Sequence, residues 1–266
     1  MLKDQSAAKS PEDSRKFVEA LARGLEVLSC FHPSDHYLGN QEISKRAKLP
    51  KSTVSRLTFT LADLGYLNYS KTNNKYCLGN AVIRLGYAKL AQMDIRRISR
   101  PLMQALAEHA QASVSLGIRD HLNMIYIDTY RNTSTLSIQL DVGSNIPIAT
   151  TSMGRAFLCA LSDEMRSGLM EQIRASDEQN WPYIKEGVEK AMADYQKFGY
   201  CTSFGNWRSE VHAVAVPLTL DDGSIMVFSC SGASFQIQKE LIENDIGPRL
   251  INLVGNVRTA LSFAKS

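Results

Sequence analysis

One segment of the chain combines polar, basic and regularly spaced apolar side chains in a way that suits a DNA-reading helix. After Pro50, the apolar residues Val54, Leu57, Leu61 and Leu64 recur at helical spacing and predict one buried face. The other side chains of the first two turns then face outward, and they are short hydroxyls and cations: Lys51, Ser52, Thr53, Ser55 and Arg56. Such groups hydrogen-bond to base edges and neutralise phosphates in a major groove. The segment therefore predicts double-stranded operator DNA as a partner.

The residues before this helix would position it. Asn40 can cap a first short helix over about residues 40–47. Lys48 and Leu49 would form a tight turn, and Pro50 suits the start of the second helix, where its missing N–H costs nothing. The pattern predicts a helix-turn-helix. The alternative is an ordinary helical hairpin with a solvated polar face.

A hairpin is expected directly after the second helix. Gly65 suits the end of that helix, and residues 66–70 and 75–78 are strand-like on either side of a turn. Lys71 and Lys75 lie near the tip of the hairpin, where they could contact backbone phosphate. A recognition helix followed by a basic hairpin is typical of a winged helix.

Charge divides the chain into two parts. Residues 1–90 carry fourteen Lys and Arg against eight Asp and Glu, a net charge of +6. Residues 91–266 carry sixteen and nineteen, a net charge of −3. A basic segment that coincides with the helix-turn-helix is the electrostatic footprint of a DNA-binding module, so two domains are expected.

Composition argues against a membrane, secreted or zinc-binding protein. No apolar run approaches the roughly 20 residues that span a bilayer. Residues 1–14 are polar, lack the apolar core of a secretion signal, and are predicted to be a disordered leader. The five cysteines are odd in number and scattered, which fits a reducing cytoplasm: Cys30, Cys77, Cys159, Cys201 and Cys230.

Further helices are expected on both sides of the winged helix. Residues 17–31 form an amphipathic pattern, and residues 78–97 would connect the two domains before Pro101 starts another helix. The connecting helix carries an apolar face around Leu85, Leu90 and Met93 that could pair two copies of the chain. The apolar side of the first helix would pack beneath the helix-turn-helix through Val18, Leu21, Leu25 and Leu28.

The remainder of the chain predicts an α+β domain, because runs of strands are interleaved with helices. The expected strands are 113–118, 124–130, 135–140, 200–204, 211–218 and 225–231. The expected helices are 154–161, 163–173, 186–198 and about 239–263, the last with a kink at Gly247-Pro248.

Five blocks of sequence, in order and at family-like spacing, resemble bacterial IclR-type transcriptional regulators. They are RGLEVLSCF (23–31), QEISKRAKLPKSTVSRLTFTLADLGYL (41–67), YCLGNAVIRLG (76–86), VGSNIPIATTSMGRAFLCAL (142–161) and EVHAVAVPLTLDDGSIMVFSCSG (210–232). The resemblance implies a winged helix over residues 15–80, a linker helix over 81–99 and a GAF/PAS-like domain over 100–266. It also implies a homodimer or homotetramer, and a small effector that modulates operator binding.

The resemblance further implies where the effector would lie. Its cavity would be lined by Ile146, Ser152, Met153, Gly154, Ser203, Phe204, Val211, Ala213, Ser229 and Ser231. A helix that starts near Gly154 would favour a carboxylate at its N-terminus. Where many relatives carry acidic residues, this chain has Ser203, Phe204 and Trp207, which favours an aromatic or aliphatic acid over a small polar oxoacid.

No catalytic or metal-binding constellation is expected, and no cofactor. The chain lacks the phosphate-binding, dinucleotide-binding, zinc-protease and serine-hydrolase motifs, and its histidines lie singly. A Cys201 nucleophile with His212 as its base is conceivable but nothing orients the pair. The more serious alternative is a DNA-binding protein whose C-terminal domain serves only to oligomerise.

Overall fold

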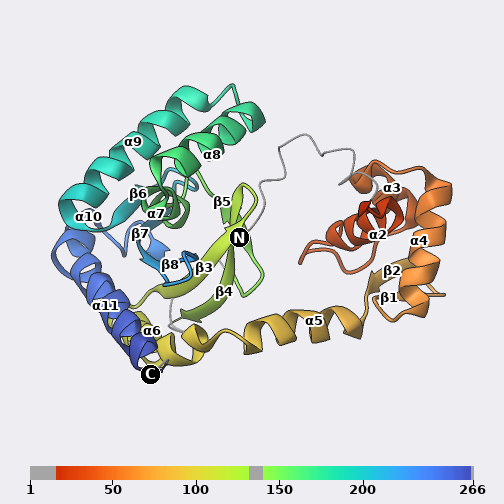
Figure 1. The fold of residues 1–266 in the computed structure, drawn as a ribbon, viewed down its shortest axis with the longest axis horizontal. Helices are drawn as coiled ribbons and strands as arrows, with labels where there is room; N and C mark the ends of the chain where they lie inside the picture. The colour runs from red at the N-terminus through yellow and green to blue at the C-terminus, as the bar shows by residue number, and fades with distance from the viewer. Residues whose placement is uncertain (1–15, 132–139, 265–266) are drawn as a thin grey trace. The chain divides into compact units, whose positions relative to one another are not determined.

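The computed structural model describes residues 16–131 and 140–264, and these form two compact units that divide between Ala91 and Gln92 (Figure 1). The expected leader over residues 1–14 lies outside the described residues, as does the expected strand over 135–140 except for Leu140.

The first unit is a helix-turn-helix followed by a hairpin. Its elements are α2 (Glu19–Ser29), α3 (Asn40–Ala47), α4 (Lys51–Asp63), β1 (Leu67–Ser70), β2 (Lys75–Leu78) and α5 (Asn80–Ala91). The two strands are antiparallel, with Leu67 opposite Leu78 and Ser70 opposite Lys75. The helix-turn-helix and the wing are thus confirmed, with bounds within a residue or two of the predicted ones.

Local chemistry sets the geometry of the two short helices. Gly39, and not the expected Asn40, is the N-cap of α3, and its backbone N–H donates to Glu42 Oε2 at 2.8 Å. The Asn40 side chain instead accepts a hydrogen bond from the Thr58 hydroxyl at 3.3 Å. Lys48 ends α3 in the left-handed conformation, with φ 52°, so the chain turns sharply toward α4. Arg46 pairs with Asp35 and also donates to the Cys30 carbonyl at 2.7 Å, which ties α3 to the end of α2.

Two helix faces of this unit differ from expectation. On α2, Gly24 and Val27 are buried, whereas Leu21 and Leu25 remain 62% and 55% exposed. The absence of a side chain at Gly24 lets Leu57 of α4 come close there, which turns the predicted face outward. On α4, Thr58 is buried, because its hydroxyl donates a hydrogen bond to the Val54 carbonyl at 3.0 Å. Leu64 was expected on the buried face but is exposed, because the helix ends at Asp63.

The expected single linker helix is wrong, because the structure has two helices there. α5 ends at Ala91, and α6 begins at Asp94, whose negative charge suits a helix N-terminus. Pro101 lies inside α6 (Asp94–Ala110) and does not start a helix.

The second unit is built on six described strands that form one antiparallel sheet in the order β5-β4-β3-β8-β7-β6. The strands are β3 (Ser113–Asp120), β4 (Asn123–Arg131), β5 (Asn145–Pro147), β6 (Cys201–Phe204), β7 (Val211–Thr219) and β8 (Ile225–Ala233). β3 and β8, more than 100 residues apart in sequence, are neighbours at the centre of the sheet, with Ser115 opposite Ser229.

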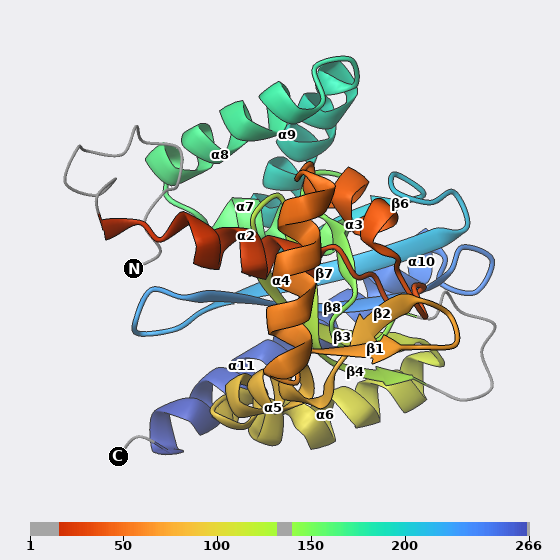
Figure 2. The same ribbon diagram turned by 90° about the vertical axis from the view of Figure 1, so that its right-hand side faces the viewer.

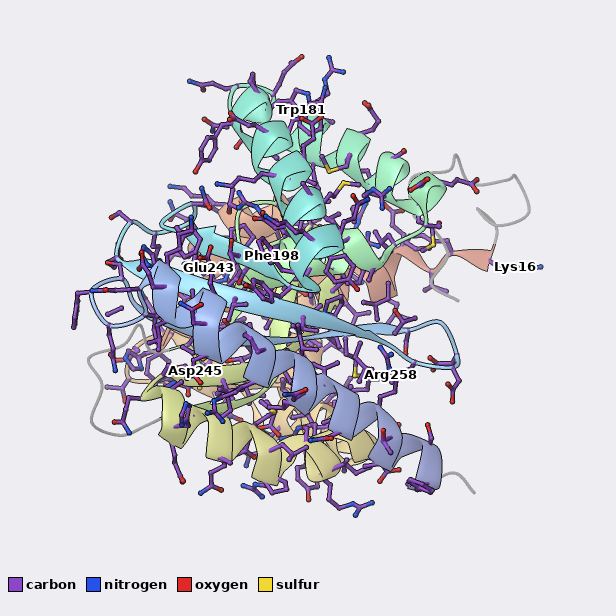
Figure 3. The ribbon with its side chains drawn as sticks, turned by 90° about the vertical axis from the view of Figure 1, so that its left-hand side faces the viewer. Lys16, Trp181, Phe198, Glu243, Asp245 and Arg258 are labelled. Atoms are coloured by element: carbon purple, nitrogen blue, oxygen red, sulfur yellow. The ribbon has the colours of Figure 1, made fainter. Side chains whose placement is uncertain are left out.

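Helices cover both faces of this sheet, as Figures 1 and 2 show. α6 and α11 (Gly247–Ala264) lie side by side on one face (Figure 3). The other face is covered by α7 (Ser152–Ala160), α8 (Asp163–Ser176) and α9 (Trp181–Phe198). Apolar side chains of these three helices and of the sheet form the larger core, which includes Met124, Ile148, Leu158, Val188 and Val227.

The expected helix over about 239–263 has an irregular start. α10 (Lys239–Leu241) passes into a π-helical turn, η1 (Ile242–Ile246), and α11 follows from Gly247. Pro248 cannot donate to the preceding turn, so the irregularity comes just before it. A side chain at Gly247 would place Cβ 2.6 Å from the Tyr200 ring, so the same point also packs closely on the residue that precedes β6.

Candidate DNA interface and effector cavity

The outward face of α4 presents the side chains that the sequence nominates for DNA. Lys51, Ser52, Ser55 and Arg56 are exposed, and Thr53 is half-buried. They occupy the first two turns of a helix whose opposite side rests on the small core around Val27, Ile43 and Leu67. The face is therefore rigidly held and accessible.

The two wing lysines lie in different surroundings. Lys71 is exposed at the turn of the hairpin, where Asn74 adopts a left-handed conformation with φ 52°. Lys75 is half-buried, and its Nζ lies 3.1 Å from Glu42 Oε2 at the start of α3. Lys75 therefore ties the wing to the helix-turn-helix, while Lys71 is the more available of the two for phosphate.

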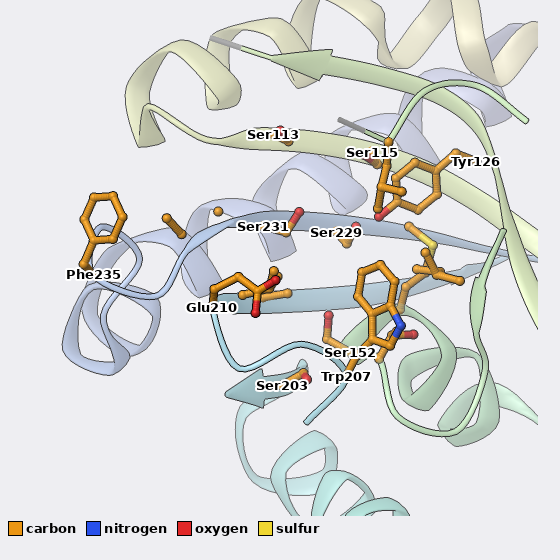
Figure 4. Close-up of a pocket in the computed structure, with 18 residues that line it drawn as sticks. Ser113, Ser115, Tyr126, Ser152, Ser203, Trp207, Glu210, Ser229, Ser231 and Phe235 are labelled. Atoms are coloured by element: carbon orange, nitrogen blue, oxygen red, sulfur yellow. The ribbon is translucent and has the colours of Figure 1, made fainter. Parts of the chain in front are cut away.

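The second unit contains a cavity of about 270 Å³ between the sheet and the N-terminus of α7 (Figure 4). Eight of the ten side chains expected from sequence line it: Ile146, Ser152, Met153, Ser203, Val211, Ala213, Ser229 and Ser231. They come from β5, α7, β6, β7 and β8. The cavity therefore brings together residues that are as far apart in the sequence as Ile146 and Ser231, a separation of 85 residues.

Gly154 and Phe204 do not line this cavity. The Gly154 backbone N–H donates to Thr151 Oγ1 at 3.1 Å, so the helix cap uses the group that was expected to face an anion. Phe204 points its ring edge-on at His212, with ring centroids 5.1 Å apart. Trp207 lies in the lining instead and supplies the aromatic wall.

Hydroxyl groups dominate the polar part of the lining. They belong to Ser113, Ser115, Tyr126, Thr151, Ser152, Ser203, Ser229 and Ser231. Burial raises the pKa of the Tyr126 phenol to about 12, although the nearby Ser115 and Ser229 hydroxyls oppose that rise. Tyr126 is therefore a neutral hydrogen-bond donor at physiological pH. Glu210 is the one charged residue among the described residues of the lining.

Ser229 has an incomplete set of hydrogen bonds. Its side chain is 2% exposed, and no described group completes a hydrogen bond with its Oγ, although it lies near the Tyr126 phenol. Leaving a buried hydroxyl unpaired costs about 1–3 kcal/mol. A ligand with an acceptor at this point would remove that cost.

A buried arginine in the first turns of α7 connects this helix to the segments on either side of it. Arg155 is 3% exposed, and it donates to the Ala149 carbonyl at 3.1 Å and to Asn206 Oδ1 at 3.0 Å. Burial lowers the pKa of its guanidinium. Asn206 in turn lies 3.4 Å from Ser203 Oγ, so this network holds one cavity hydroxyl in place.

Comparison with known families identifies the two units. The description "IclR helix-turn-helix domain" matches residues 20–71, and "Bacterial transcriptional regulator IclR C-terminal" matches residues 87–254. The chain belongs to the IclR family. It is a DNA-binding transcriptional regulator with an N-terminal helix-turn-helix domain and a C-terminal α+β domain, as the sequence predicts.

Individual relatives agree along nearly the whole chain. The HTH-type transcriptional regulator TsaQ1/TsaQ2 of Comamonas testosteroni is 32% identical and covers 96% of this chain and 92% of its own length. The crystal structure of an IclR family regulator from Brucella abortus is 44% identical, with a TM-score of 0.88 over 97% of this chain and 96% of that one. An IclR homologue from Microbacterium hydrocarbonoxydans, complexed with 4-hydroxybenzoate, shares the fold, with 20% identity and a TM-score of 0.75 over 91% and 99% of the two chains.

Sequence reasoning missed one residue on the recognition helix of this IclR-family regulator. Phe59 is 74% exposed and lies one turn beyond Ser55, in a shallow hollow with Arg56 and Thr60. The i, i+4 spacing from Lys51 through Ser55 to Phe59 places it on the outward face, a signal that the sequence already contained.

Reasoning from sequence also missed part of the cavity of this IclR-family chain. Ser113, Ser115 and Tyr126 reach the lining from β3 and β4, and Phe235 lies at its edge after β8. Only the strand register brings Ser115 opposite Ser229, so local spacing carries no signal for it.

None of the described helices is both long and apolar enough to cross a membrane.

Proposed function

We propose that the cavity binds a small organic acid with an aromatic or similar apolar body, and that binding changes the affinity for operator DNA. The observation that supports this proposal is the composition of the cavity lining, which combines hydroxyl donors, the N-terminus of α7 and apolar side chains. The first N–H groups of α7, at Ser152 and Met153, have no partner within the helix, and the helix dipole favours an anion there. Trp207, Ile146 and Val211 supply the surfaces for a ring.

The 4-hydroxybenzoate bound by the Microbacterium relative supports an aromatic acid as the first compound to test. Calorimetry should compare 4-hydroxybenzoate and benzoate with benzyl alcohol, which keeps the ring and lacks the carboxylate. We expect the acids to bind and to raise the melting temperature, and the alcohol to do neither. Operator release or recruitment by the same acid would then be followed by gel shift. Stabilisation by neutral alcohols or sugars alone would overturn the anion assignment.

Ser229→Ala separates ligand binding from stability. We expect affinity for the acid to fall by about 1–2 kcal/mol, because a hydrogen bond to a charged group is lost. The unliganded protein should lose little stability, because the contact between the buried Ser229 hydroxyl and the Tyr126 phenol falls short of hydrogen-bond geometry. Cys230→Ala, a buried neighbour outside the lining, is the matched control and should leave affinity unchanged. Unaltered binding by the Ser229 variant would place the acid elsewhere.

For DNA, we propose that Lys51, Ser52, Thr53, Ser55 and Arg56 contact the major groove and that Lys71 and Lys75 contact phosphate from the wing. The exposure of α4 and of Lys71 supports this, whereas Lys75 would have to exchange its ion pair with Glu42 for a phosphate. The location that follows is the cytoplasm, where bacterial operators are. We further infer that the chain is not an enzyme, since the cavity hydroxyls serve binding and the family consists of regulators.

Phe59 should read a thymine methyl group, because an exposed ring on a major-groove face suits that apolar target. On an operator selected from random duplexes, deoxyuridine would replace thymine at one position at a time. At one position the wild type should lose about 1 kcal/mol, the worth of one buried methyl. Phe59→Ala should lose affinity and show no further loss with deoxyuridine there, while Thr60→Ala should behave as wild type. Equal methyl dependence in both proteins would exclude this contact.

We also propose a homodimer or homotetramer that pairs through the first unit. α5 buries only Ala81, and Ile83 and Tyr87, one turn apart, are each 70% exposed. Of the residues first expected to pair, Leu85 is 59% exposed, whereas Leu90 and Met93 are half-buried. Light scattering at micromolar concentration should give a dimeric or tetrameric mass. Ile83→Glu with Tyr87→Glu should lower that mass, whereas Lys89→Glu should not. A monomeric mass for the wild type would contradict both the dimer and the tetramer.

The alternative function, a C-terminal domain that only oligomerises, predicts different results. Under this alternative, no acid would bind the second unit. Substitutions on the surface of the second unit, rather than on α5, would change the mass of the assembly in light scattering. The unpaired Ser229 hydroxyl favours the effector-binding function, because a purely structural core would gain from an apolar residue there.

A further inference from the structure

Two thiols touch in the second unit, and neither of them belongs to the cavity lining. Cys159 lies in the last turn of α7, and Cys201 begins β6. Their sulfur atoms are 3.5 Å apart, at contact distance for unbonded sulfurs. A disulfide bond is about 2.05 Å long, so the pair needs an approach of only about 1.5 Å.

The two thiols differ in exposure and charge environment, which gives them separate roles. Cys159 is half-buried, and a hydrogen bond with Cys201 lowers its pKa, with further help from the Arg166 and Arg155 guanidiniums. Cys201 is buried, and the same hydrogen bond together with burial raises its pKa. A reactive thiolate beside a protected partner is the arrangement found in reversible thiol sensors.

The remaining cysteines provide a contrast. Cys230 is fully buried, and burial raises its pKa to about 12. Cys30 is buried, and burial likewise raises its pKa. Neither is in contact with another thiol among the described residues. Within the second unit, reactivity should therefore concentrate on Cys159; Cys77, a half-buried thiol of the first unit, is tested by substitution.

We propose that Cys159 and Cys201 form a reversible disulfide when the protein meets hydrogen peroxide. The Cys159 thiolate attacks one peroxide oxygen, the O–O bond breaks, and a sulfenic acid and one water form after protonation. Cys201 sulfur then attacks the sulfenic sulfur, forming the S–S bond and releasing a second water. Two thiols are oxidised and one peroxide is reduced to two waters; a dithiol reductant reverses the change.

The position of the pair connects it to the cavity. α7 carries Ser152 and Met153 at its other end, and Ser203 stands two residues after Cys201 on β6. A bond between Cys159 and Cys201 would draw these two walls together at one end. Because packed interiors transmit small displacements, we expect the oxidised protein to bind the acid with altered affinity, an expectation that rests on the proposed function.

The disulfide itself is tested without any effector. Reduced full-length protein is treated with one equivalent of hydrogen peroxide, quenched with an alkylating reagent and digested with trypsin. We expect alkylatable thiols to fall from five to three, the mass to fall by two hydrogens, and the Cys159 and Cys201 peptides to be joined until dithiothreitol separates them. Five alkylatable thiols after treatment, or a link that joins other cysteines, would overturn the proposal.

Variants separate the two chemical steps. Cys201→Ser should stop at a sulfenic acid on Cys159 that dimedone traps, while Cys159→Ser should react with neither peroxide nor dimedone. Cys77→Ser, which removes a half-buried thiol of the other unit, should form the disulfide as wild type does. Dimedone labelling spread evenly over the cysteines would show that Cys159 has no special reactivity.

Calorimetry with 4-hydroxybenzoate on the reduced and oxidised proteins is the second readout. A disulfide without a change in acid affinity would uphold the thiol chemistry and refute its coupling to the cavity. An absence of acid binding in both forms would count against the proposed effector and leave the mapped disulfide as it is.

Discussion

Arg56→Ala should weaken operator binding by about 1–3 kcal/mol, or about 5- to 150-fold. Arg56 is exposed on the second turn of α4, where a guanidinium can donate two hydrogen bonds to a guanine edge. The loss should concentrate on one base pair of the site. A gel-shift titration at one fixed salt concentration, on operator variants at each position, measures it.

Arg174→Ala supplies the control for this measurement, since it removes an exposed arginine of α8 in the second unit. It should leave operator affinity unchanged. Both variants should unfold as wild type does, because neither side chain is buried. If Arg56→Ala bound the operator as tightly as wild type, α4 would not be the element that reads it.

Gly154→Ala should destabilise the second unit by about 3 kcal/mol or more, the upper range for overpacked sites. The new Cβ would lie 1.9 Å from the Ile148 carbonyl oxygen and 2.4 Å from its carbonyl carbon. These are backbone atoms, so no rotamer change relieves the clash. The strand end before α7 and the helix itself would have to separate, which would also open the cavity.

Gly168→Ala is the matched control, because a Cβ there meets nothing within 4 Å. It lies inside α8 and should stabilise the protein slightly, by up to about 1 kcal/mol. Both tryptophans, Trp181 and Trp207, belong to the second unit, so tryptophan fluorescence during urea unfolding reports on that unit alone. A Gly154 variant as stable as wild type would show that the Ile148 segment can move away freely.

The parts of the fold that sequence predicted well are those fixed by local chemistry. The helix-turn-helix follows from Pro50 at the start of α4 and from the regular spacing of apolar residues after it, although the cap predicted at Asn40 lies one residue earlier, at Gly39. The wing follows from its alternating strand residues and a short turn. Each signal involves neighbours within a few positions, so no long-range packing had to be known.

The misplaced helix faces required knowledge of the partner surface. Leu21 and Leu25 have the spacing of a buried stripe, yet α2 buries Gly24 and Val27 because α4 approaches through the glycine. Spacing alone could not reveal that. Similarly, Gly154 was expected to offer its N–H to an anion, but Thr151 takes that donor as a cap.

Most of the cavity residues could be named because the family resemblance supplied positions that spacing does not. Ser229 and Ser231 share a strand face, and period-two alternation indicates that much. Their partners across the strand pair, Ser115 and Ser113, lie on a strand more than 100 residues earlier in the sequence. Only the pairing of β3 with β8 brings them into the cavity lining.

That pairing has a consequence for how selectivity can change. Ser113 stands opposite Ser231 and Ser115 opposite Ser229, so the cavity floor is a double row of hydroxyls. A hydroxyl hydrogen rotates, and each group can therefore act as donor or acceptor according to what faces it. Such a floor accepts acids that differ in the hydrogen-bonding groups on their apolar bodies, while the N-terminus of α7 holds the carboxylate that they share. Discrimination then falls to the rigid apolar surfaces of Trp207, Ile146 and Met153, and a single exchange at one of these positions could retune the regulator to a new metabolite while its polar scaffold stays the same.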